Sequence, residues 1–286
     1  MSTIVLTGAT SGIGFATAKG LLNYATSLLL IGRLSEKAAS AITQLKSIST
    51  ACNIQYYEAD LSDQVEICQA AKAILKDHSV IDVLINNAGV WYSDRHLVSP
   101  GIEMCFAVNY LAPFLLTHLL FPAILRSPEG RIVNVTSGTH RRGSIHFQDL
   151  TLSDHYTGMQ SYAQSKLALV LFSYEFHRRN PHRNISINCL EPGMVNTQIG
   201  QKHAHWLHRL IWRTLRLGSV SLEKGAETSI FLASSSKING VSGRYWANRK
   251  IIKSSNESYN ESTAAQLWGV SLRLCHIQSY FEPISG

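Results

Sequence analysis

The sequence predicts an α/β fold, with one doubly wound parallel sheet that carries helices on both faces. Short apolar segments alternate with longer segments of helical period along most of the chain. The first apolar segment runs into a glycine-rich turn and then a helical pattern, which is the order of a strand–turn–helix unit. Several later apolar segments end in polar residues, as parallel strands do at one common edge of a sheet.

Length and composition limit the classes of protein. The 286 residues suffice for one large α/β domain or two small ones, and no break marks a second domain, so we interpret residues 1–286 as one domain. Hydrophobic residues make up 45% and charged residues 16%, as in a soluble globular protein. The net charge of +7 favours an anionic partner: a phosphorylated cofactor, an anionic membrane surface or nucleic acid. No basic cluster is interleaved with aromatic residues, so we expect no nucleic acid.

Cysteine usage and the start of the chain predict a cytoplasmic location. The chain enters an apolar strand at Thr3, which leaves no room for a signal peptide. The apolar run Leu111–Leu125 is shorter than a bilayer-spanning helix and contains two prolines, so we expect a buried helix. The cysteines are five in number, scattered and without a Cys-x-x-Cys pair, which predicts free thiols and no metal site: Cys52, Cys68, Cys105, Cys189 and Cys275.

The glycine-rich turn follows the strand Thr3–Thr7. Gly8 permits a tight turn, and Gly12 and Gly14 let a ligand and the neighbouring chain approach the backbone. The helix that follows offers unpaired N–H groups to a pyrophosphate. We interpret the turn as a dinucleotide-binding, Rossmann-type motif; a purely structural turn is the alternative. The residues assigned to the cofactor here are Gly8, Thr10, Ser11, Gly12, Ile13 and Gly14.

The second strand, Ser27–Ile31, ends in Gly32 and Arg33. In a dinucleotide-binding fold an acidic residue near this place binds the ribose 2′-hydroxyl, whereas an arginine accommodates a 2′-phosphate. No acidic residue occurs before Glu36. A guanidinium can bind the phosphate with two parallel hydrogen bonds, so Arg33 favours NADP over NAD; a solvated surface arginine is the alternative.

The next units repeat the strand–helix order. A helix over Glu36–Ser49 leads to a strand over Asn53–Glu58, after which Asp60 either faces the adenine or caps the following helix. A strand over Ile81–Ile85 then ends in Asn86–Gly89, which places side-chain amides at the carboxyl edge of the sheet. The residues assigned to the cofactor in these units are Asp60, Leu61, Asn87, Ala88 and Gly89.

Two later helices carry polar residues that require an explanation. A helix from about Pro100 to Arg126 contains Asn109 in an apolar setting, where its amide needs a partner, so it either kinks the helix or holds a water. In a helix over Ser161–Arg179, Tyr162 and Lys166 are four residues apart and share one face. An ammonium beside a phenol lowers the tyrosine's pKa from about 10, which would let it transfer a proton near neutral pH. The alternative is a packed tyrosine beside a solvated lysine.

The remaining elements complete the sheet. A strand over Ile185–Leu190 closes on a Pro-Gly turn, which leaves the residues after it near the far end of the cofactor. A last strand is expected at Gly243–Ala247, and a helix over Ser262–Leu274, capped by Ser262 or Thr263, forms a C-terminal extension at 260–275. The cofactor residues expected after the strand are Pro192, Gly193, Val195 and Thr197.

Together these elements closely resemble the short-chain dehydrogenase/reductase family. The match covers about residues 3–250 in the family's order, and its elements are Thr7–Gly14, Asn86–Gly89, Asn109, Ser137, Tyr162 with Lys166, and Pro192–Thr197. The resemblance implies that Tyr162 exchanges a proton with the substrate oxygen and that Ser137 hydrogen-bonds this oxygen. It also implies that Lys166 lowers the tyrosine's pKa and holds the nicotinamide ribose, and that Asn109 anchors a water that links Lys166 to solvent.

Finer features resemble the retinol dehydrogenase-like branch, which implies NADP(H) and apolar carbonyl or alcohol substrates. These features are the long interval between Ser137 and Tyr162 and the segment from Tyr245 to Trp268. We expect no N-terminal membrane anchor, and in this the chain would depart from the branch. It also has Ser11 where many NADP enzymes of the family have a basic residue.

The resemblance further implies a substrate lid at about 198–218. This segment has apolar residues such as Trp206 and Leu210 at helical spacing, with basic residues on other faces. The basic side fits either peripheral contact with an anionic membrane or a solvated helix face. Family members also form homodimers or homotetramers through the helices that carry Asn109 and Tyr162.

The sequence therefore predicts an NADP(H)-dependent oxidoreductase that interconverts an apolar aldehyde or ketone and its alcohol. A non-catalytic NADP-binding sensor or scaffold is the alternative. Such proteins typically lose the tyrosine or the lysine, whereas this chain has all four residues expected to be catalytic: Asn109, Ser137, Tyr162 and Lys166.

Overall fold

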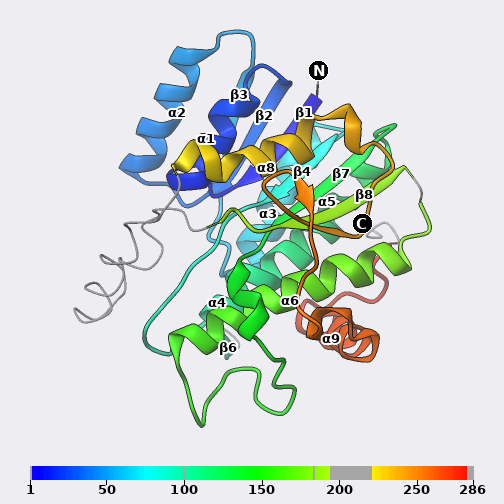
Figure 1. Ribbon diagram of the computed structural model, residues 1–286. Coiled ribbons are helices and arrows are strands. Elements are labelled where there is room, and N and C mark those ends of the chain that lie inside the picture. The colour runs from blue at the N-terminus through cyan, green and yellow to red at the C-terminus, as the bar shows by residue number, and fades with distance from the viewer. Residues whose placement is uncertain (1, 99–100, 183, 194–220, 282–286) are drawn as a thin grey trace.

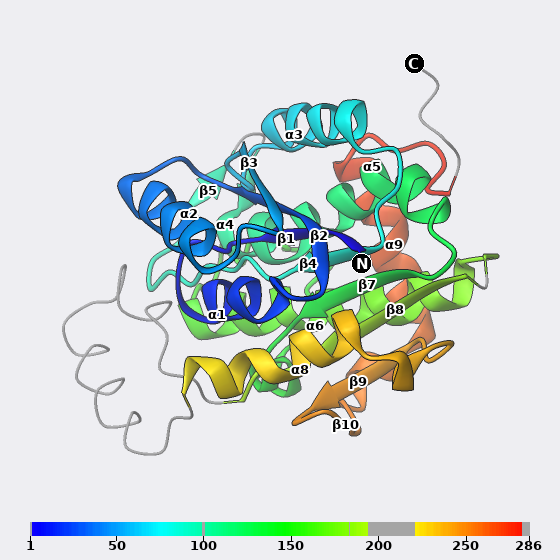
Figure 2. The same ribbon diagram turned by 90° about the horizontal axis from the view of Figure 1, so that it is seen from above.

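The computed structural model describes residues 2–98, 101–182, 184–193 and 221–281. Within them, eight strands form one sheet in the order β10-β9-β8-β7-β4-β1-β2-β3 (Figures 1 and 2). All pairs are parallel except β9 with β10, a short antiparallel edge that was not predicted from the sequence. The strands are β1 (Ser2–Thr7), β2 (Ala25–Gly32), β3 (Asn53–Glu58), β4 (Val83–Asn86), β7 (Gly130–Val135), β8 (Ile185–Leu190), β9 (Arg244–Ala247) and β10 (Lys250–Ile251).

The strand order reverses between β1 and β4. From β1 the chain proceeds to β2 and β3 on one side, and then returns to β4, β7, β8 and β9 on the other. The loops after β1 and β4 therefore leave the sheet in opposite directions and open a crevice at its carboxyl edge. The predicted doubly wound parallel sheet is confirmed, and the crevice is the place where such folds bind ligands.

Helices cover both faces of the sheet. Alternate strand residues separate the core into two clusters: Val5, Leu29 and Leu84 face one layer, whereas Ile4 and Leu6 face the other. The helices α1 and α8 lie side by side on the second face (Figures 1 and 2). The main helices are α1 (Gly12–Leu21), α2 (Glu36–Ile48), α3 (Gln64–Asp77), α4 (Met104–Phe106), α5 (Ala112–Leu125), α6 (Gly158–Arg179), α8 (Leu222–Ser234) and α9 (Glu261–Leu274).

The helix expected from Pro100 begins later and is not uniform. A short hairpin of β5 (Leu97–Val98) and β6 (Ile102–Glu103) precedes α4, and a π-helical turn over Ala107–Leu111 joins α4 to α5. Asn109 lies within this turn, so the expected irregularity is present.

The resulting helical stretch Met104–Leu125 has 22 residues and a mean hydropathy of 1.6, enough to cross a membrane by length and composition. It is the only such stretch among the residues described, and 94% of its most apolar window is buried inside the protein. The length argument against a membrane span was thus wrong, but the expected buried helix is confirmed.

The C-terminal helix α9 packs against α6 (Figure 1). Trp268 of α9 and Tyr280 after it are buried against Phe114 of α5 and Phe172 of α6, with ring centroids 4.7 to 6.2 Å apart. As a result both α5 and α6 are buried along almost their whole length. The expected caps at Ser262 and Thr263 were wrong, because Asn260 caps α9 by accepting a hydrogen bond from the backbone N–H of Thr263.

Candidate active site

The glycine-rich turn packs against itself and against the loop after β4 too closely for side chains at Gly8 or Gly14. Gly8 and Gly12 have φ angles of +71° and +58°, which favour glycine. A Cβ on Gly8 would lie 2.8 Å from the Cα of Ala88, and one on Gly14 would overlap the carbonyl oxygen of Gly8. Ser11 is the N-cap of α1 but accepts no hydrogen bond from the first turn, and that turn has no acidic residue. The helix therefore presents unpaired N–H groups, which fit a pyrophosphate.

Asn87 and Ala88 tie the end of β4 to the end of β1. The backbone N–H groups of both residues donate to Thr7 Oγ1 at 3.0 Å, and Asn87 Nδ2 donates to the carbonyl oxygen of Thr7 at 2.8 Å. The amide of Asn87 thus holds the two loops together across the crevice. Ala88 lies against Gly8, so the predicted Asn-Ala-Gly segment borders the glycine-rich turn.

Asn109 fixes the segment that follows Gly89. Its Oδ1 accepts from the backbone N–H of Val90 at 2.7 Å, and its Nδ2 donates to the carbonyl oxygen of Val90 at 3.0 Å and to Ser165 Oγ at 2.9 Å. A Cβ on Gly89 would lie 3.4 Å from both Asn109 Oδ1 and Lys166 Nζ. The structure therefore brings Gly89, Asn109 and Lys166 together at the carboxyl end of β4.

Lys166 and Tyr162 lie on one face of α6, as predicted. The Nζ atom of Lys166 lies 5.7 Å from the centroid of the Tyr162 ring and donates to the carbonyl oxygen of Val135 at 3.0 Å. Lys166 is only 3% exposed. Burial lowers its pKa from 10.5 to about 8.

The pKa of Tyr162 differs from the sequence-based expectation. Burial raises it to about 12, although a hydrogen bond with the Ser137 side chain acts to lower it. The expected decrease does not occur in this structure, because desolvation of the phenolate outweighs the interactions that favour it. Tyr162 is therefore a neutral phenol at neutral pH.

Ser137 follows β7 and caps the 3-10 helix Gly138–Arg142. Its Oγ accepts from the backbone N–H of Thr139 at 3.2 Å and donates to Thr139 Oγ1 at 3.1 Å. Ser137 and Tyr162 are close enough for their side chains to interact. All four residues expected to be catalytic thus converge at the carboxyl edge of the sheet.

Arg33 and Asp60 lie together at the ends of β2 and β3. The guanidinium Nη1 of Arg33 is 3.8 Å from Asp60 Oδ2, and the two side chains are 68% and 37% exposed. Asp60 Oδ1 accepts from the N–H and hydroxyl of Ser62, while Asp63 caps α3, so the suggestion that Asp60 caps this helix was wrong. Leu61 is buried beside them.

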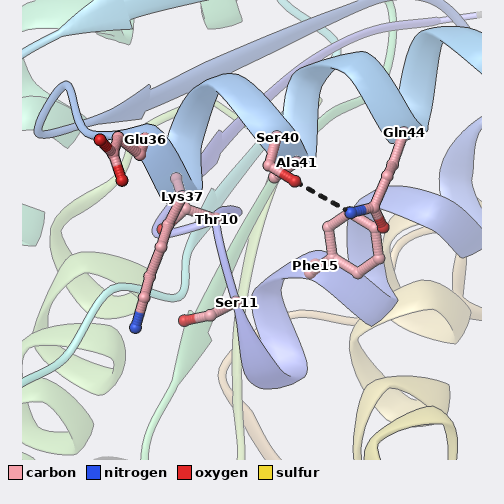
Figure 3. Close-up of a pocket in the computed structure, with 8 residues that line it drawn as sticks. All are labelled: Thr10, Ser11, Phe15, Glu36, Lys37, Ser40, Ala41 and Gln44. Atoms are coloured by element: carbon pink, nitrogen blue, oxygen red, sulfur yellow. Dashed lines mark hydrogen bonds between the residues drawn. The ribbon is translucent and has the colours of Figure 1, made fainter.

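A cavity of about 360 Å³ separates the glycine-rich turn from α2 (Figure 3). Thr10 and Ser11 line it from the turn, and Lys37 extends from α2 toward Ser11. Its other lining residues are Phe15, Glu36, Ser40, Ala41 and Gln44. Lys37 could not be predicted as a site residue from the sequence, because it lies neither at the end of the second strand nor within the turn.

The last predicted cofactor segment is described only in part. Pro192 and Gly193 follow β8, and Gly193 has a φ of +81°, which favours glycine. Val195, Thr197 and the expected lid at 198–218 lie outside the described residues.

Comparison with known proteins identifies the family. The family model for short-chain dehydrogenases matches residues 2–208. The chain belongs to this family. It is 35% identical to human retinol dehydrogenase 14 and 34% identical to human polyprenol dehydrogenase; each match covers 94% of this chain and 84% of the relative. The predicted retinol dehydrogenase-like branch is therefore confirmed.

Solved structures support the same fold. An uncharacterised protein from Mycobacterium paratuberculosis has a TM-score of 0.77 at 27% identity, covering 96% of this chain and 94% of its own. The NADPH-bound carbonyl reductase from chicken fatty liver has a TM-score of 0.66 at 21% identity, with coverages of 89% and 99%. The short-chain dehydrogenase family comprises oxidoreductases that act on CH–OH groups with a nicotinamide dinucleotide, and this chain is such an oxidoreductase.

Proposed function

We propose that this short-chain dehydrogenase interconverts an apolar aldehyde or ketone and its alcohol with NADP(H), with Tyr162 as the acid/base. The observation that carries the proposal is the placement of Lys166 Nζ between the Tyr162 ring, 5.7 Å away, and Gly89 at the end of β4. A proton-transfer group thereby lies beside the crevice in which this fold binds dinucleotides.

Each residue has a role in the proposed mechanism. A bound nicotinamide dinucleotide supplies or accepts the hydride. The Tyr162 phenol, with a pKa of about 12, is protonated at neutral pH and donates its proton to the substrate oxygen during reduction. The Ser137 hydroxyl donates a hydrogen bond to the same oxygen and stabilises its developing charge. Lys166 supplies positive charge next to the phenol, which favours the phenolate that remains.

The substrate class rests on the relatives. Retinol and polyprenol, named in the two human proteins, are both apolar isoprenoid alcohols. An identity of about one third over nearly the whole chain supports the same broad class here. We therefore expect a long apolar alcohol or its carbonyl form rather than a sugar or another polar alcohol.

The preference for NADP rests on two cations near the end of β2. The ion pair of Arg33 with Asp60 is long and exposed, so it contributes little stability and leaves the guanidinium free to bind a 2′-phosphate. Lys37, the second cation, lines the cavity beside Ser11. It takes the place of the basic residue that many NADP enzymes of the family have at the position of Ser11.

Replacement of Lys37 tests this preference. Lys37→Ala should raise the KM for NADPH about 10-fold, since a hydrogen bond to a charged group contributes about 1.5 kcal/mol. The KM for NADH should stay unchanged. Lys46→Ala on the last turn of α2 is the matched control, because Lys46 does not line the cavity. Equal effects of Lys37→Ala on both cofactors would contradict the 2′-phosphate role.

We also propose a cytoplasmic location, with the membrane as a peripheral contact that brings an apolar substrate. The five cysteines are all free thiols, and four of them are buried, which fits a reducing compartment. Co-sedimentation of the purified chain with anionic vesicles, compared with neutral ones, measures the membrane contact.

The decisive experiment replaces the phenol. NADPH oxidation is followed with retinal, medium-chain aldehydes, steroid ketones and quinones. Tyr162→Phe should reduce kcat by about 100-fold or more on any accepted substrate, because it removes the acid/base. Tyr174→Phe is the matched control: Tyr174 lies on the same helix but hydrogen-bonds Ser254 away from the crevice. NADPH binding without turnover in the wild type would instead support the sensor or scaffold.

A further inference from the structure

A polar cluster with two buried members, His140 and Tyr245, lies directly behind Ser137. We define it by its side chains: His140, Arg141, Glu191 and Tyr245. None of them was singled out as a site residue, and they come from three elements: the 3-10 helix after β7, the loop after β8, and β9. Because buried polar groups need partners, the hydrogen bonds of this cluster can be followed atom by atom.

The tautomer of His140 is fixed by its neighbours. The backbone N–H of Ser255 donates to His140 Nε2 at 3.1 Å, so Nε2 carries no hydrogen. In the neutral ring the hydrogen is then on Nδ1, which lies 2.7 Å from the carbonyl oxygen of Ser137 and donates to it. Burial lowers the pKa of His140, which agrees with a neutral ring.

The other members surround this ring and restrain it. The Tyr245 hydroxyl lies 3.2 Å from His140 Nδ1 and donates to Glu191 Oε2 at 2.9 Å. Arg141 forms an ion pair with the same carboxylate at 2.5 Å, and donates to the carbonyl oxygen of Lys253 at 3.1 Å. The cluster therefore connects Ser137 to the loop that starts at Glu191 and to the segment before α9.

Ser137 is anchored on both sides as a result. On its N-terminal side, the backbone N–H and the Oγ1 of Thr136 each donate to the carbonyl oxygen of Leu190 at 2.7 Å. On its C-terminal side, the Ser137 carbonyl oxygen accepts from both the backbone N–H and Nδ1 of His140, at 3.1 and 2.7 Å. Two donors on one carbonyl oxygen fix the plane of the peptide from which the Ser137 side chain departs.

We propose that neutral His140 is a positioning residue, which sets the direction of the Ser137 hydroxyl by holding the Ser137 carbonyl through Nδ1–H. The inference rests on the proposed function, in which that hydroxyl binds the substrate oxygen. It assigns His140 no contact with substrate or cofactor. A misplaced hydroxyl would weaken stabilisation of the transition state and leave ground-state binding intact.

Two substitutions separate the two ring nitrogens. In His140→Asn the amide nitrogen can occupy the place of Nδ1 and still donate to Ser137, but the partner of Ser255 is lost. In His140→Gln the longer side chain reaches the place of Nε2 and can still accept from Ser255, but the donor to Ser137 is lost. Both remove one hydrogen bond of the ring, so a purely structural role predicts similar losses of stability and no difference in kcat.

The proposal predicts different kinetics for the two variants of the full chain. His140→Gln should lower kcat by about 10-fold or more, because a small displacement of a group that binds the reacting atoms reduces the rate strongly. The KM for NADPH and the KM for the carbonyl should stay unchanged. His140→Asn should keep a kcat close to that of the wild type. Equal kcat values for the two variants would overturn the positioning role.

A third variant covers the case in which His140→Gln does not fold. Tyr245→Phe keeps the ring volume and removes the hydroxyl that restrains His140, binds Glu191 and accepts from Thr136 Oγ1, so kcat should fall while the KM values stay. If His140→Gln misfolds and folded Tyr245→Phe has the kcat of the wild type, the proposal is overturned. Absence of turnover in the wild type would overturn the proposed function itself. An active wild type with variants of unchanged kcat would reject only the role of His140.

Discussion

At the scale of the residue, burial of Lys166 in the folded protein disfavours the charged form of its side chain. Burial lowers its pKa to about 8, whereas the unfolded chain has the ordinary value of 10.5. Below pH 8 both states carry the charge, and the folded state bears the full desolvation penalty of about 3 kcal/mol. As pH rises from 8 to 10.5, the folded state loses its proton first and the penalty disappears.

Lys166→Met should therefore stabilise the protein while it removes the proposed activity. At pH 7 we expect the free energy of unfolding to rise by about 2 kcal/mol, since the lost hydrogen bond to Val135 offsets part of the gain. At pH 9.5 the gain should be smaller, because the wild type has lost part of its penalty. Urea unfolding at both pH values measures this, and a gain that increases with pH would contradict the pKa of about 8.

At the scale of the element, the π-helical turn Ala107–Leu111 aims Asn109 at the backbone of Val90. Three hydrogen bonds of the Asn109 amide connect this turn to the segment after β4 and to Ser165 of α6. The asparagine thus joins two of the elements that carry the proposed active site, which explains why a polar amide lies inside an apolar helix.

Asn109→Ala should lower both stability and activity. Loss of three hydrogen bonds in a buried setting should cost about 2 to 3 kcal/mol. The freed segment after Gly89 should also reduce kcat. Asn188→Ala is the matched control: Asn188 is equally buried and makes three hydrogen bonds, to Val241, Arg244 and Trp246. Thermal unfolding should show similar losses for both, and the kcat of folded protein should fall only for Asn109→Ala.

At the scale of the whole molecule, α9 and Tyr280 occupy the outer faces of α5 and α6. These are the helices through which family members were expected to pair, and the rings of Phe114, Phe172 and Trp268 are buried between them. A second copy would have to displace α9 before it reached the same faces. We therefore predict a monomer, or a dimer built on another surface.

Light scattering after gel filtration measures the oligomeric state. Trp268→Ala should lower the free energy of unfolding by about 3 to 5 kcal/mol, through the cavity left among these rings. It should also promote self-association, as α9 loosens and the apolar faces become accessible. A wild-type dimer that Trp268→Ala leaves unchanged in both stability and association would contradict this role of α9.

Much of the fold could be predicted because its signals are local. Buried parallel strands read as apolar runs, so β3 and β8 have the predicted bounds, and the other predicted strands differ by at most two residues at either end. The short β10 was missed because two exposed residues have no apolar pattern. The glycines that permit the turn after β1 could be predicted as well, because they directly follow the strand in the sequence.

What could not be predicted depends on partners distant in sequence. Lys37 meets Ser11, and His140 meets Tyr245 and Ser255, on other elements, and no spacing within the sequence points to these contacts. The pKa of Tyr162 was predicted in the wrong direction because pair spacing reveals the neighbouring charge but not the degree of burial, which here dominates.

The π-helical turn has a consequence for how this helix can change during evolution. It accommodates one residue more than an α-helix of the same pitch, so the side chains before Ala107 and after Leu111 are out of phase by about 100°. Loss of one residue within the turn would bring the two halves into phase and rotate either α4 or the apolar surface of α5 away from its present contacts. The number of residues in this stretch is therefore tied to the hydrogen bonds between Asn109 and Val90.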